Sequence, residues 1–312
     1  MGSSGLVVPD FMLAGRGLPK DLPRLQEQGY VFDLKVDGVR AMVTCDADQL
    51  SLLSRNDKGF ARRFPELIGP LEALRTRSVV LDTEIAVPDR RGLPSWPLTQ
   101  QRTARQSGVG VDPRLSARLY AFDVLRLDGA DTTAVPFRER RELLQDLARS
   151  WPPELVLTVC SDDADRLWNL VLEHRLEGVI AKRADSPYRP GRGADWVKVK
   201  SVHTLTCLVG GVTWAGAEGT SDPRSLDLYL VDPAGALVPV GSCSAGVGAP
   251  MRRELVRRLR TPPLVVEVEY SQITTGHVLR HPVLRALRPD VGVLDCSIDQ
   301  LGEPADGPGH RT

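Results

Sequence analysis

The feature that most restricts the fold is a change of pattern near residue 201. Before it, apolar runs of strand length alternate with stretches of helical periodicity. They follow a Pro- and Gly-punctuated start that we expect to wrap the surface. The predicted strands are 30–35, 41–46, 51–54, 79–87, 117–125, 155–159, 178–182 and 196–200, and the predicted helices are 61–74, 137–148 and 163–173. Strands mixed with helices predict an α+β domain built on a mixed sheet.

The rest of the chain contains short apolar runs separated by Gly and Pro. The predicted strands are 205–213, 225–231, 237–242 and 265–271, and a basic helix is predicted at 250–260. Four or five short strands with one helix are typical of a small β-barrel of the OB type. We therefore expect a first domain over 1–201, an OB-fold domain over 202–300 and a flexible tail over 301–312.

Composition excludes several classes of protein. Hydrophobic residues make up 42% and charged residues 26%, which is typical of a soluble globular chain and not of a disordered one. No apolar run approaches the ~18–20 residues that a membrane span needs, and the first residues lack the pattern of a secretory signal. The five cysteines are scattered without a Cys-x-x-Cys pair, which favours a reducing cytoplasm over a disulfide scaffold.

Lysine is used sparingly and in particular places. Net charge is zero, so any surface for nucleic acid must be a local patch. Only six of the 40 basic residues are lysines, and four of the six fall in three short segments, namely Lys35, Lys182, Lys198 and Lys200. Lysine, unlike arginine, can lose its proton and become a nucleophile, and it is a compact phosphate binder. This placement indicates a chemical role for the four lysines.

The segment around Lys35 is the strongest candidate site. Lys35 ends a predicted strand and is followed by Asp37, Gly38 and Arg40. Glycine permits a close approach between the backbone and a ligand. A free lysine, with a pKa near ~10.4, is a poor nucleophile at neutral pH, but neighbouring lysines or a metal ion would lower that pKa. Taken alone, an Asp-Gly pair between apolar stretches more often marks just a hairpin turn, with Lys35 and Asp37 as solvated flanks.

Other predicted strands carry polar or aromatic residues at or near their ends. Each of them has an ordinary interpretation as a core aromatic or a solvated charge. Together they supply an aromatic platform, carboxylates for a divalent metal and cations for a triphosphate, which nucleotidyl transfer requires. The two lysines of the last strand alternate with valines and so share one face. The residues are Asp82, Glu84, Phe122, Asp123, Glu177, Lys182, Lys198 and Lys200.

In order and spacing, these segments resemble the motifs of the covalent nucleotidyltransferases, and specifically of the ATP-dependent DNA ligases. The matching motifs are Lys35-x-Asp37-Gly38-x-Arg40, Glu84, Phe122-Asp123, Glu177-Gly178 and Lys198-x-Lys200. Further matches are Ser54-Arg55-Asn56 and the segment from Tyr188 to Trp196, which contains Gly191-Arg192. The segment with Arg280-His281-Pro282 resembles the last motif of bacterial ligases associated with end joining. A lone Lys-x-Asp-Gly is weak, whereas the ordered set spans nearly the whole chain and is specific.

The resemblance implies that 1–201 is a nucleotidyltransferase (adenylation) domain that uses ATP and Mg²⁺ or Mn²⁺. Lys35 would attack the α-phosphate to form lysyl-AMP, with Lys198 and Lys200 as further catalytic residues. AMP would then pass to the 5′-phosphate of a DNA nick, and the 3′-hydroxyl would displace it. The implied nucleotide-binding residues are Asp33, Asp37, Gly38, Arg40, Arg55, Glu84, Phe122, Glu177, Lys182, Arg192 and Arg288, and Glu84 and Glu177 would also bind the metal.

Two of these implied residues have particular roles. Phe122 would stack on the adenine. Asp33 stands where the family has an acidic residue, commonly Glu, that reads the adenine amine, and the shorter side chain predicts a slight change in purine selection.

One position departs from the family. The final motif typically reads Arg-x-Asp-Lys, but here Arg288-Pro289-Asp290 is followed by Val291. Because the missing lysine removes a cation expected to orient the leaving pyrophosphate, we predict slow adenylation.

The implied partners are nicked double-stranded DNA and an end-joining or repair protein, with no membrane and a monomeric state. Two alternatives share the Lys-x-Asp-Gly core, an RNA ligase and a capping guanylyltransferase. An alternative of another class is a catalytically weakened protein that binds nicks or acts as a scaffold, which Val291 alone suggests.

Overall fold

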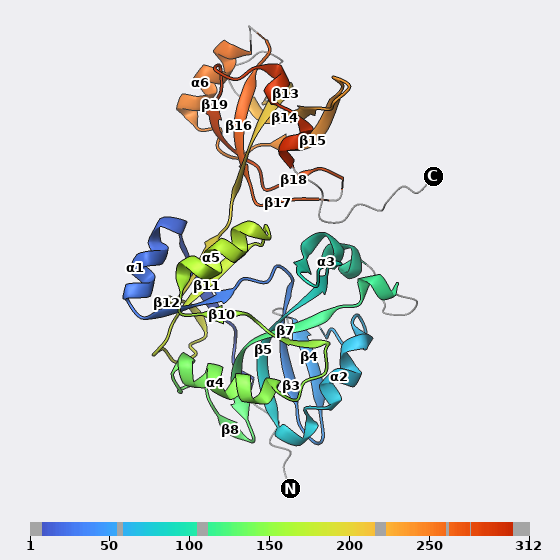
Figure 1. Ribbon diagram of the computed structural model, residues 1–312, viewed down its shortest axis with the longest axis vertical. Coiled ribbons are helices and arrows are strands. Elements are labelled where there is room, and N and C mark those ends of the chain that lie inside the picture. Colours follow the sequence, from blue (N-terminus) through green and yellow to red (C-terminus); the bar gives the residue numbers. More distant parts are fainter. Residues whose placement is uncertain are drawn as a thin grey trace. The chain divides into compact units, whose positions relative to one another are not determined.

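The computed structural model describes residues 8–54, 59–104, 112–215, 223–259, 262–274 and 276–301. The chain divides into two compact units, Met1–Ser201 and Val202–Thr312 (Figure 1). No helix in these described segments is long and apolar enough to cross a membrane.

The first unit is built on two sheets. The five-stranded sheet has the order β1-β12-β11-β2-β10, with β1 at Met12–Gly17, β12 at Gly191–Lys200, β11 at Gly178–Arg183, β2 at Tyr30–Leu34 and β10 at Cys160–Ser161. The seven-stranded sheet has the path β4-β3-β5-β7-β8, at Leu50–Ser54, Val39–Cys45, Val79–Pro88, Arg118–Leu127 and Ala130–Asp131, with β6 (Pro94–Ser95) and β9 (Leu155–Leu157) off this path. One pair in each sheet is parallel and the others are antiparallel, so the predicted α+β class with mixed sheets is confirmed.

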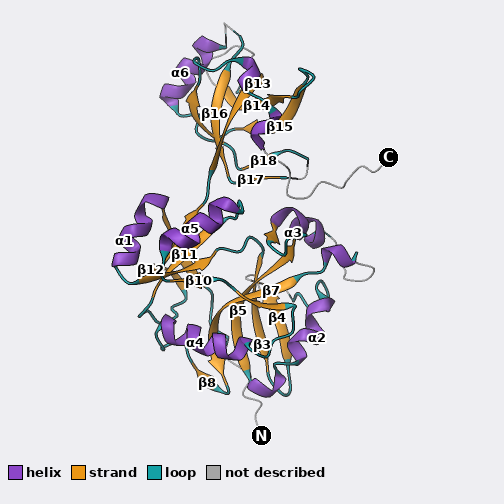
Figure 2. Ribbon diagram, viewed as in Figure 1, coloured by secondary structure: helices purple, strands orange, loops and turns teal. Residues whose placement is uncertain are grey.

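Helices pack beside these sheets (Figure 2). They are α1 (Leu22–Glu27), α2 (Ile68–Glu72), α3 (Trp96–Thr103), α4 (Phe137–Ala148) and α5 (Ala164–Glu173), with 3-10 turns at Pro19–Asp21, Pro65–Leu67, Arg75–Arg77 and Pro113–Leu115. The side chain of Asp163 caps α5 by accepting from the Arg166 N–H. The helix buries Leu167 and Val171, four residues apart, against the five-stranded sheet.

One expectation for this unit was wrong, and two of its elements were not predicted. The predicted helix over 61–74 is reduced to the short α2 preceded by a 3-10 turn, because prolines disfavour helical geometry in the preceding residue and remove backbone donors. β1, within the start of the chain that we expected to wrap the surface, pairs in parallel with β12 and was not predicted. α3 was not predicted, because its sequence Trp-Pro-Leu-Thr-Gln-Gln-Arg-Thr has no apolar periodicity.

The second unit contains a five-stranded antiparallel sheet in the order β15-β14-β13-β16-β19. These strands are Leu237–Cys243, Pro223–Val231, His203–Trp214, Val265–Tyr270 and Val283–Leu287. The hairpin of β17 (Gln272–Ile273) and β18 (Leu279–Arg280), the helix α6 (Ala249–Arg258) and the 3-10 turns Val293–Asp295 and Ile298–Leu301 complete it. Its core includes Leu205, Leu228, Val266 and Val268. Over the described strands the five-stranded sheet is open, with β15 and β19 at its edges.

Candidate active site

One carboxylate joins two of the predicted lysines. Lys35 follows β2, Glu177 precedes β11 and Lys200 ends β12, and these three strands are antiparallel neighbours. Lys200 Nζ lies 2.8 Å from Glu177 Oε1, and Lys35 Nζ contacts Glu177 Oε2. Burial raises the pKa of Glu177, but the two lysines outweigh it and bring the pKa below its ordinary value. Glu177 is therefore an ionised carboxylate between two ammonium groups.

A second carboxylate lies in the same electrostatic environment. Burial raises the pKa of Glu84, on β5, to about 8, while Lys35 and Arg40 oppose that rise and Glu177 adds to it. Gly38 lies against β5, because a Cβ there would come 2.3 Å from the Ile85 carbonyl oxygen and 2.9 Å from Glu84 Cγ. Only glycine allows this close approach. The structure therefore brings Glu84 beside the group formed by Lys35, Glu177 and Lys200.

Glu84 and Glu177 are suited to a divalent cation that is only partly coordinated by protein. Carboxylate oxygens are the hard ligands that Mg²⁺ prefers, and Mg²⁺ is commonly bound by one or two carboxylates, water and substrate phosphates. No cluster of three or more His, Cys, Asp or Glu arranged to hold a metal occurs in the described ranges. Phosphate oxygens and water would have to complete the coordination.

Cations gather on the face of β12 that carries Lys198. Burial lowers the pKa of Lys198, and the charges of Lys200, Arg192, Lys35 and Arg16 lower it further. Arg16 lies opposite Lys198 in the parallel pair of β1 and β12. Arg192 donates to the Ala14 carbonyl oxygen at 2.6 Å. This concentration of positive charge fits a polyanion such as a triphosphate.

An aromatic platform lies beside these groups. Phe122, on β7, meets Trp196 edge to face with ring centroids 6.1 Å apart, and the Arg40 guanidinium lies 5.5 Å from the Phe122 centroid. Arg40 is bound by both oxygens of Asp82, at 2.9 and 2.5 Å. Burial lowers the pKa of Arg40, but the charge and the hydrogen bonds of Asp82 outweigh this effect, so the pKa lies above its ordinary value.

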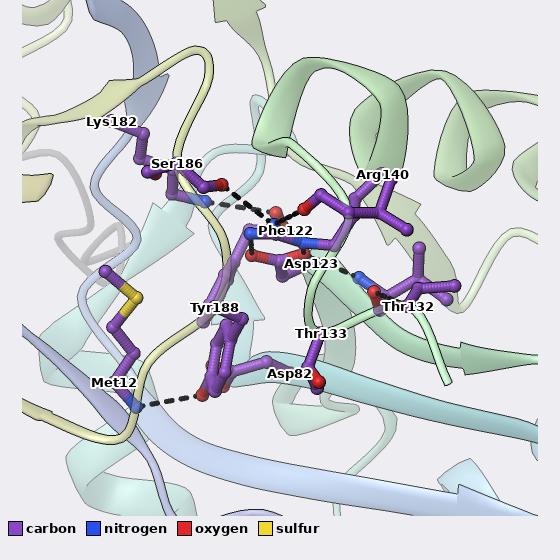
Figure 3. A network of polar contacts seen from close by, with 12 residues as sticks. Met12, Asp82, Phe122, Asp123, Thr132, Thr133, Arg140, Lys182, Ser186 and Tyr188 are labelled. Carbon is purple, nitrogen blue, oxygen red and sulfur yellow. Dashed lines mark hydrogen bonds and ion pairs between the residues drawn. The ribbon is translucent and has the colours of Figure 1, made fainter.

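The partner of Arg40 is itself supported by Tyr188, which the sequence placed in a segment matching the family but gave no role. Tyr188 donates to Asp82 Oδ2 at 2.7 Å and accepts from the Met12 N–H at 2.9 Å (Figure 3). From the sequence, Asp82 and Glu84 were recognised only as two neighbouring carboxylates. Side chains two residues apart on a strand point to the same face, so the alternation along β5 already indicated that Asp82 lies on the face of the sheet that carries Glu84.

Asp33 and Lys182 form a buried ion pair. Each side chain is 1% exposed, and Lys182 Nζ lies 2.5 Å from Asp33 Oδ2. The other oxygen, Oδ1, accepts from Thr158 Oγ1 at 3.0 Å and lies 3.4 Å from Arg141 Nη1. Sequence reasoning did not find Thr158 or Arg141, which lie more than a hundred residues from Asp33 along the chain and carry no local signal.

The remaining predicted residues are placed differently. Asp37 is partly buried after β2. Arg288 belongs to the second unit, where it binds Asp290 at 2.8 Å and Glu267 at 2.9 Å. Arg55 lies outside the described residues. Val291 packs, partly buried, against an apolar cluster of the second unit made of Leu208, Val231, Val265 and Cys296.

Comparison with known proteins identifies a family. The family model of the ATP dependent DNA ligase domain matches residues 12–200. The multifunctional non-homologous end joining DNA repair protein LigD of Mycobacterium tuberculosis is 33% identical over 309 residues, covering 89% of this chain and 38% of the relative. A probable DNA ligase of Saccharopolyspora erythraea is 33% identical over 279 residues, covering 83% of this chain and 54% of the relative. The chain thus spans less than two thirds of each of these curated relatives.

Solved structures agree with these sequence matches. The crystal structure of the ligase domain from M. tuberculosis LigD is 30% identical, with a TM-score of 0.56 and coverage of 90% of this chain and 95% of that chain. A mycobacterial DNA ligase D complexed with ATP and MES is 29% identical, with a TM-score of 0.54 and the same coverage. The resemblance stated from the motifs is confirmed.

Proposed function

The chain belongs to the ATP-dependent DNA ligases, and from that premise we propose that it seals 3′-hydroxyl/5′-phosphate nicks in double-stranded DNA through lysyl-AMP on Lys35. The observation that carries the proposal is the group of Lys35, Glu177 and Lys200 with Glu84 beside it. This group combines a candidate nucleophile, a phosphate-binding cation and two carboxylates, as nucleotidyl transfer requires.

In the first step, Lys35, held as an ammonium group beside Glu177, gives up a proton to solvent. Its neutral Nζ attacks the α-phosphorus of ATP and loses a second proton as the phosphoramidate forms. A P–N bond forms and the P–O bond to pyrophosphate breaks. The ammonium groups of Lys198 and Lys200 offset the negative charge that grows on the α-phosphate and the leaving group. The P–N bond then breaks as a DNA 5′-phosphate oxygen takes the AMP, and attack by the 3′-hydroxyl releases AMP and closes the backbone.

A divalent cation, Mg²⁺ or Mn²⁺, belongs to this proposal. Glu84 and Glu177 would hold it together with phosphate oxygens, and the bound ion would supply positive charge to the triphosphate. Phe122 would provide the stacking surface for adenine, and Arg40, fixed by Asp82, would provide a permanent cation beside that surface.

The wider organisation follows the same proposal. Residues 1–201 would be the adenylation domain, 202–300 an OB-fold domain and 301–312 a tail. Five short antiparallel strands with one helix have the content of an OB fold. Because the relatives include end-joining repair proteins, we expect an end-joining or repair partner, and we expect a monomer that works in the cytoplasm.

The test is transfer of label from α-labelled ATP to the protein. The protein is incubated with Mg²⁺ or Mn²⁺, separated under denaturing conditions and chased with nicked DNA. We expect label on the wild type and on Lys20→Ala, an exposed lysine control, and none on Lys35→Ala. The label should disappear as sealed DNA forms.

Other outcomes would contradict the proposal. Label from GTP in place of ATP would indicate a capping enzyme. If neither nucleotide labels the wild type, pyrophosphate and nicked DNA are added directly to reveal protein purified as the adenylate. Failure of this second assay as well would reject the ligase reaction.

A further inference from the structure

The carboxylate of Asp33 is bound on both of its oxygens inside the protein. One oxygen receives Lys182 Nζ at 2.5 Å, and the other receives Thr158 Oγ1 at 3.0 Å with Arg141 Nη1 at 3.4 Å. The side chain is 1% exposed. A carboxylate has about four acceptor sites, so these partners do not use all of them. The side chain is enclosed, however, so an adenine amine could reach a free site only if the surrounding side chains moved apart. The geometry therefore opposes a direct contact between Asp33 and the base.

Lys182 connects the two sheets of the first unit. It lies on β11 in the five-stranded sheet, and its Nζ donates to the carbonyl oxygen of Phe122 on β7, in the seven-stranded sheet, at 3.0 Å. The same Nζ lies 4.7 Å from the Phe122 ring centroid and 4.5 Å from that of Trp196. Lys182 thus holds both the backbone and the ring of Phe122.

The neighbouring residue is held as firmly. Asp123 accepts from Arg140 at 2.7 and 2.8 Å, and both side chains are completely buried. Figure 3 shows Lys182, Phe122, Asp123 and Arg140 in one polar network. With Asp123 fixed by Arg140 and the Phe122 carbonyl fixed by Lys182, the position of the aromatic platform depends on the charge pair behind it.

We propose that Asp33 is a positioning residue: it fixes Lys182, and through Lys182 the Phe122 platform relative to Lys35, and it does not select adenine. This inference rests on the proposed adenylation. Loss of the pair should misplace bound nucleotide and lower the adenylation rate for every purine, since about 1 Å of misplacement costs on the order of 100-fold. Selectivity between ATP and GTP should remain.

The first experiment compares Asp33→Asn, Lys182→Met and the double variant. We expect kcat for adenylation to fall about 10- to 100-fold in each single variant, with the ratio of kcat/KM for ATP to that for GTP within about threefold of wild type. Because Asn keeps an oxygen that can accept from the amine, Asp33→Leu, which has no acceptor, is measured as well. A carboxylate that reads the amine would change that ratio a hundredfold or more in Asp33→Leu. That result would overturn the proposal.

Pairing is tested by thermal unfolding of the same variants. Each single change leaves one buried charge without its partner, whereas the double change removes both. We expect the double variant to have a higher melting temperature than the less stable of the two single variants. If the melting temperature of the double variant falls by the sum of the two single-variant decreases, Asp33 and Lys182 do not act as a pair.

A milder variant keeps the test usable if these proteins do not fold. Thr158→Val retains both charges and removes only the hydroxyl that orients Asp33. We expect a lower kcat with an unchanged ATP-to-GTP ratio, while Asp128→Asn, at an exposed arginine pair, should behave as wild type. A kcat for Thr158→Val equal to that of this control would overturn the proposal.

Failure of the proposed ligase reaction can be distinguished from failure of the positioning role of Asp33. If wild-type protein never forms an adenylate, the ligase reaction fails, but binding of ATP and of GTP without turnover can still be measured from the fluorescence of the tryptophans, which include Trp196 beside Phe122. Asp33→Leu, which has no acceptor, should weaken the binding of both nucleotides equally. Weaker ATP binding with unchanged GTP binding would overturn the positioning role.

Discussion

Lys200 Nζ lies 2.8 Å from Oε1 of Glu177, and the other carboxylate oxygen contacts Lys35. The candidate nucleophile and a candidate phosphate-binding cation are therefore held by one carboxylate that is 6% exposed. Since these lysines lower the pKa of Glu177 against the effect of burial, the three charges depend on one another.

Replacement of Glu177 by Gln should slow adenylation on the order of 100-fold, the effect of removing one pre-organised electrostatic group. Gln keeps the shape but leaves two neighbouring ammonium groups without their carboxylate. The rate of lysyl-AMP formation measures this. Glu173→Gln, an exposed change on α5, is the matched control and should retain the wild-type rate. Equal rates for the two variants would exclude a role for the Glu177 charge.

Glu84 should make the metal-free protein less stable as pH rises. Its pKa is about 8 in the folded protein against 4.5 as the ordinary value, so between these values the folded state binds more protons than the unfolded state. The stabilisation is complete below pH 4.5 and is lost as pH rises towards about 8.

Glu84→Gln should remove this dependence. The difference in the free energy of unfolding between the variant and the wild type should therefore rise with pH and level off above pH 8. Between pH 4.5 and 8 the rise should be on the order of 2–4 kcal/mol, after allowance for solvent screening. Urea unfolding in a metal chelator at several pH values measures it. The exposed Glu142→Gln is the control. A difference between Glu84→Gln and wild type that stays constant with pH would contradict the prediction.

Gly38→Ala should impair both stability and adenylation. The added Cβ would meet the Ile85 carbonyl oxygen at 2.3 Å, and because that oxygen belongs to a backbone strand, the turn after Lys35 must move. We expect a loss of about 1–3 kcal/mol. Gly69→Ala in α2, where the Cβ has no neighbour within 4 Å, should be close to neutral, because Pro70 disfavours helical geometry in a preceding residue with a Cβ and so offsets the gain in helix propensity. Thermal unfolding and labelling test both variants, and similar behaviour of the two would refute the packing argument.

Val291→Lys should accelerate formation of the lysyl adenylate, because it restores the cation typical of the family's final motif. It should also lower the melting temperature slightly, because Val291 packs against the cluster of Leu208, Val231, Val265 and Cys296. Val293→Lys alters the same cluster without restoring the motif and should bring no acceleration. If Val291→Lys forms the adenylate no faster than wild type, slow adenylation does not result from the missing lysine.

The sequence predicted those elements whose pattern lies within their own residues, such as helices with apolar periodicity. The helices over 137–148 and 163–173 have clear apolar periodicity and are present as α4 and α5. Prolines ended the helix predicted over 61–74, and the unpatterned segment Met12–Gly17 became a strand only because β12 was available to pair with it. Elements defined by a partner strand cannot be recognised from their own residues.

By itself the sequence determined which residue types carry the chemistry and in what order they occur, because a nucleophilic lysine, carboxylates and phosphate-binding cations have distinct chemical properties. Only the tertiary structure decided which of them meet. It joined Glu177 to Lys35 and Lys200, and it enclosed Asp33 with Lys182, Thr158 and Arg141. Ion pairs between residues so distant along the chain form through sheet register and packing, and no local pattern encodes either.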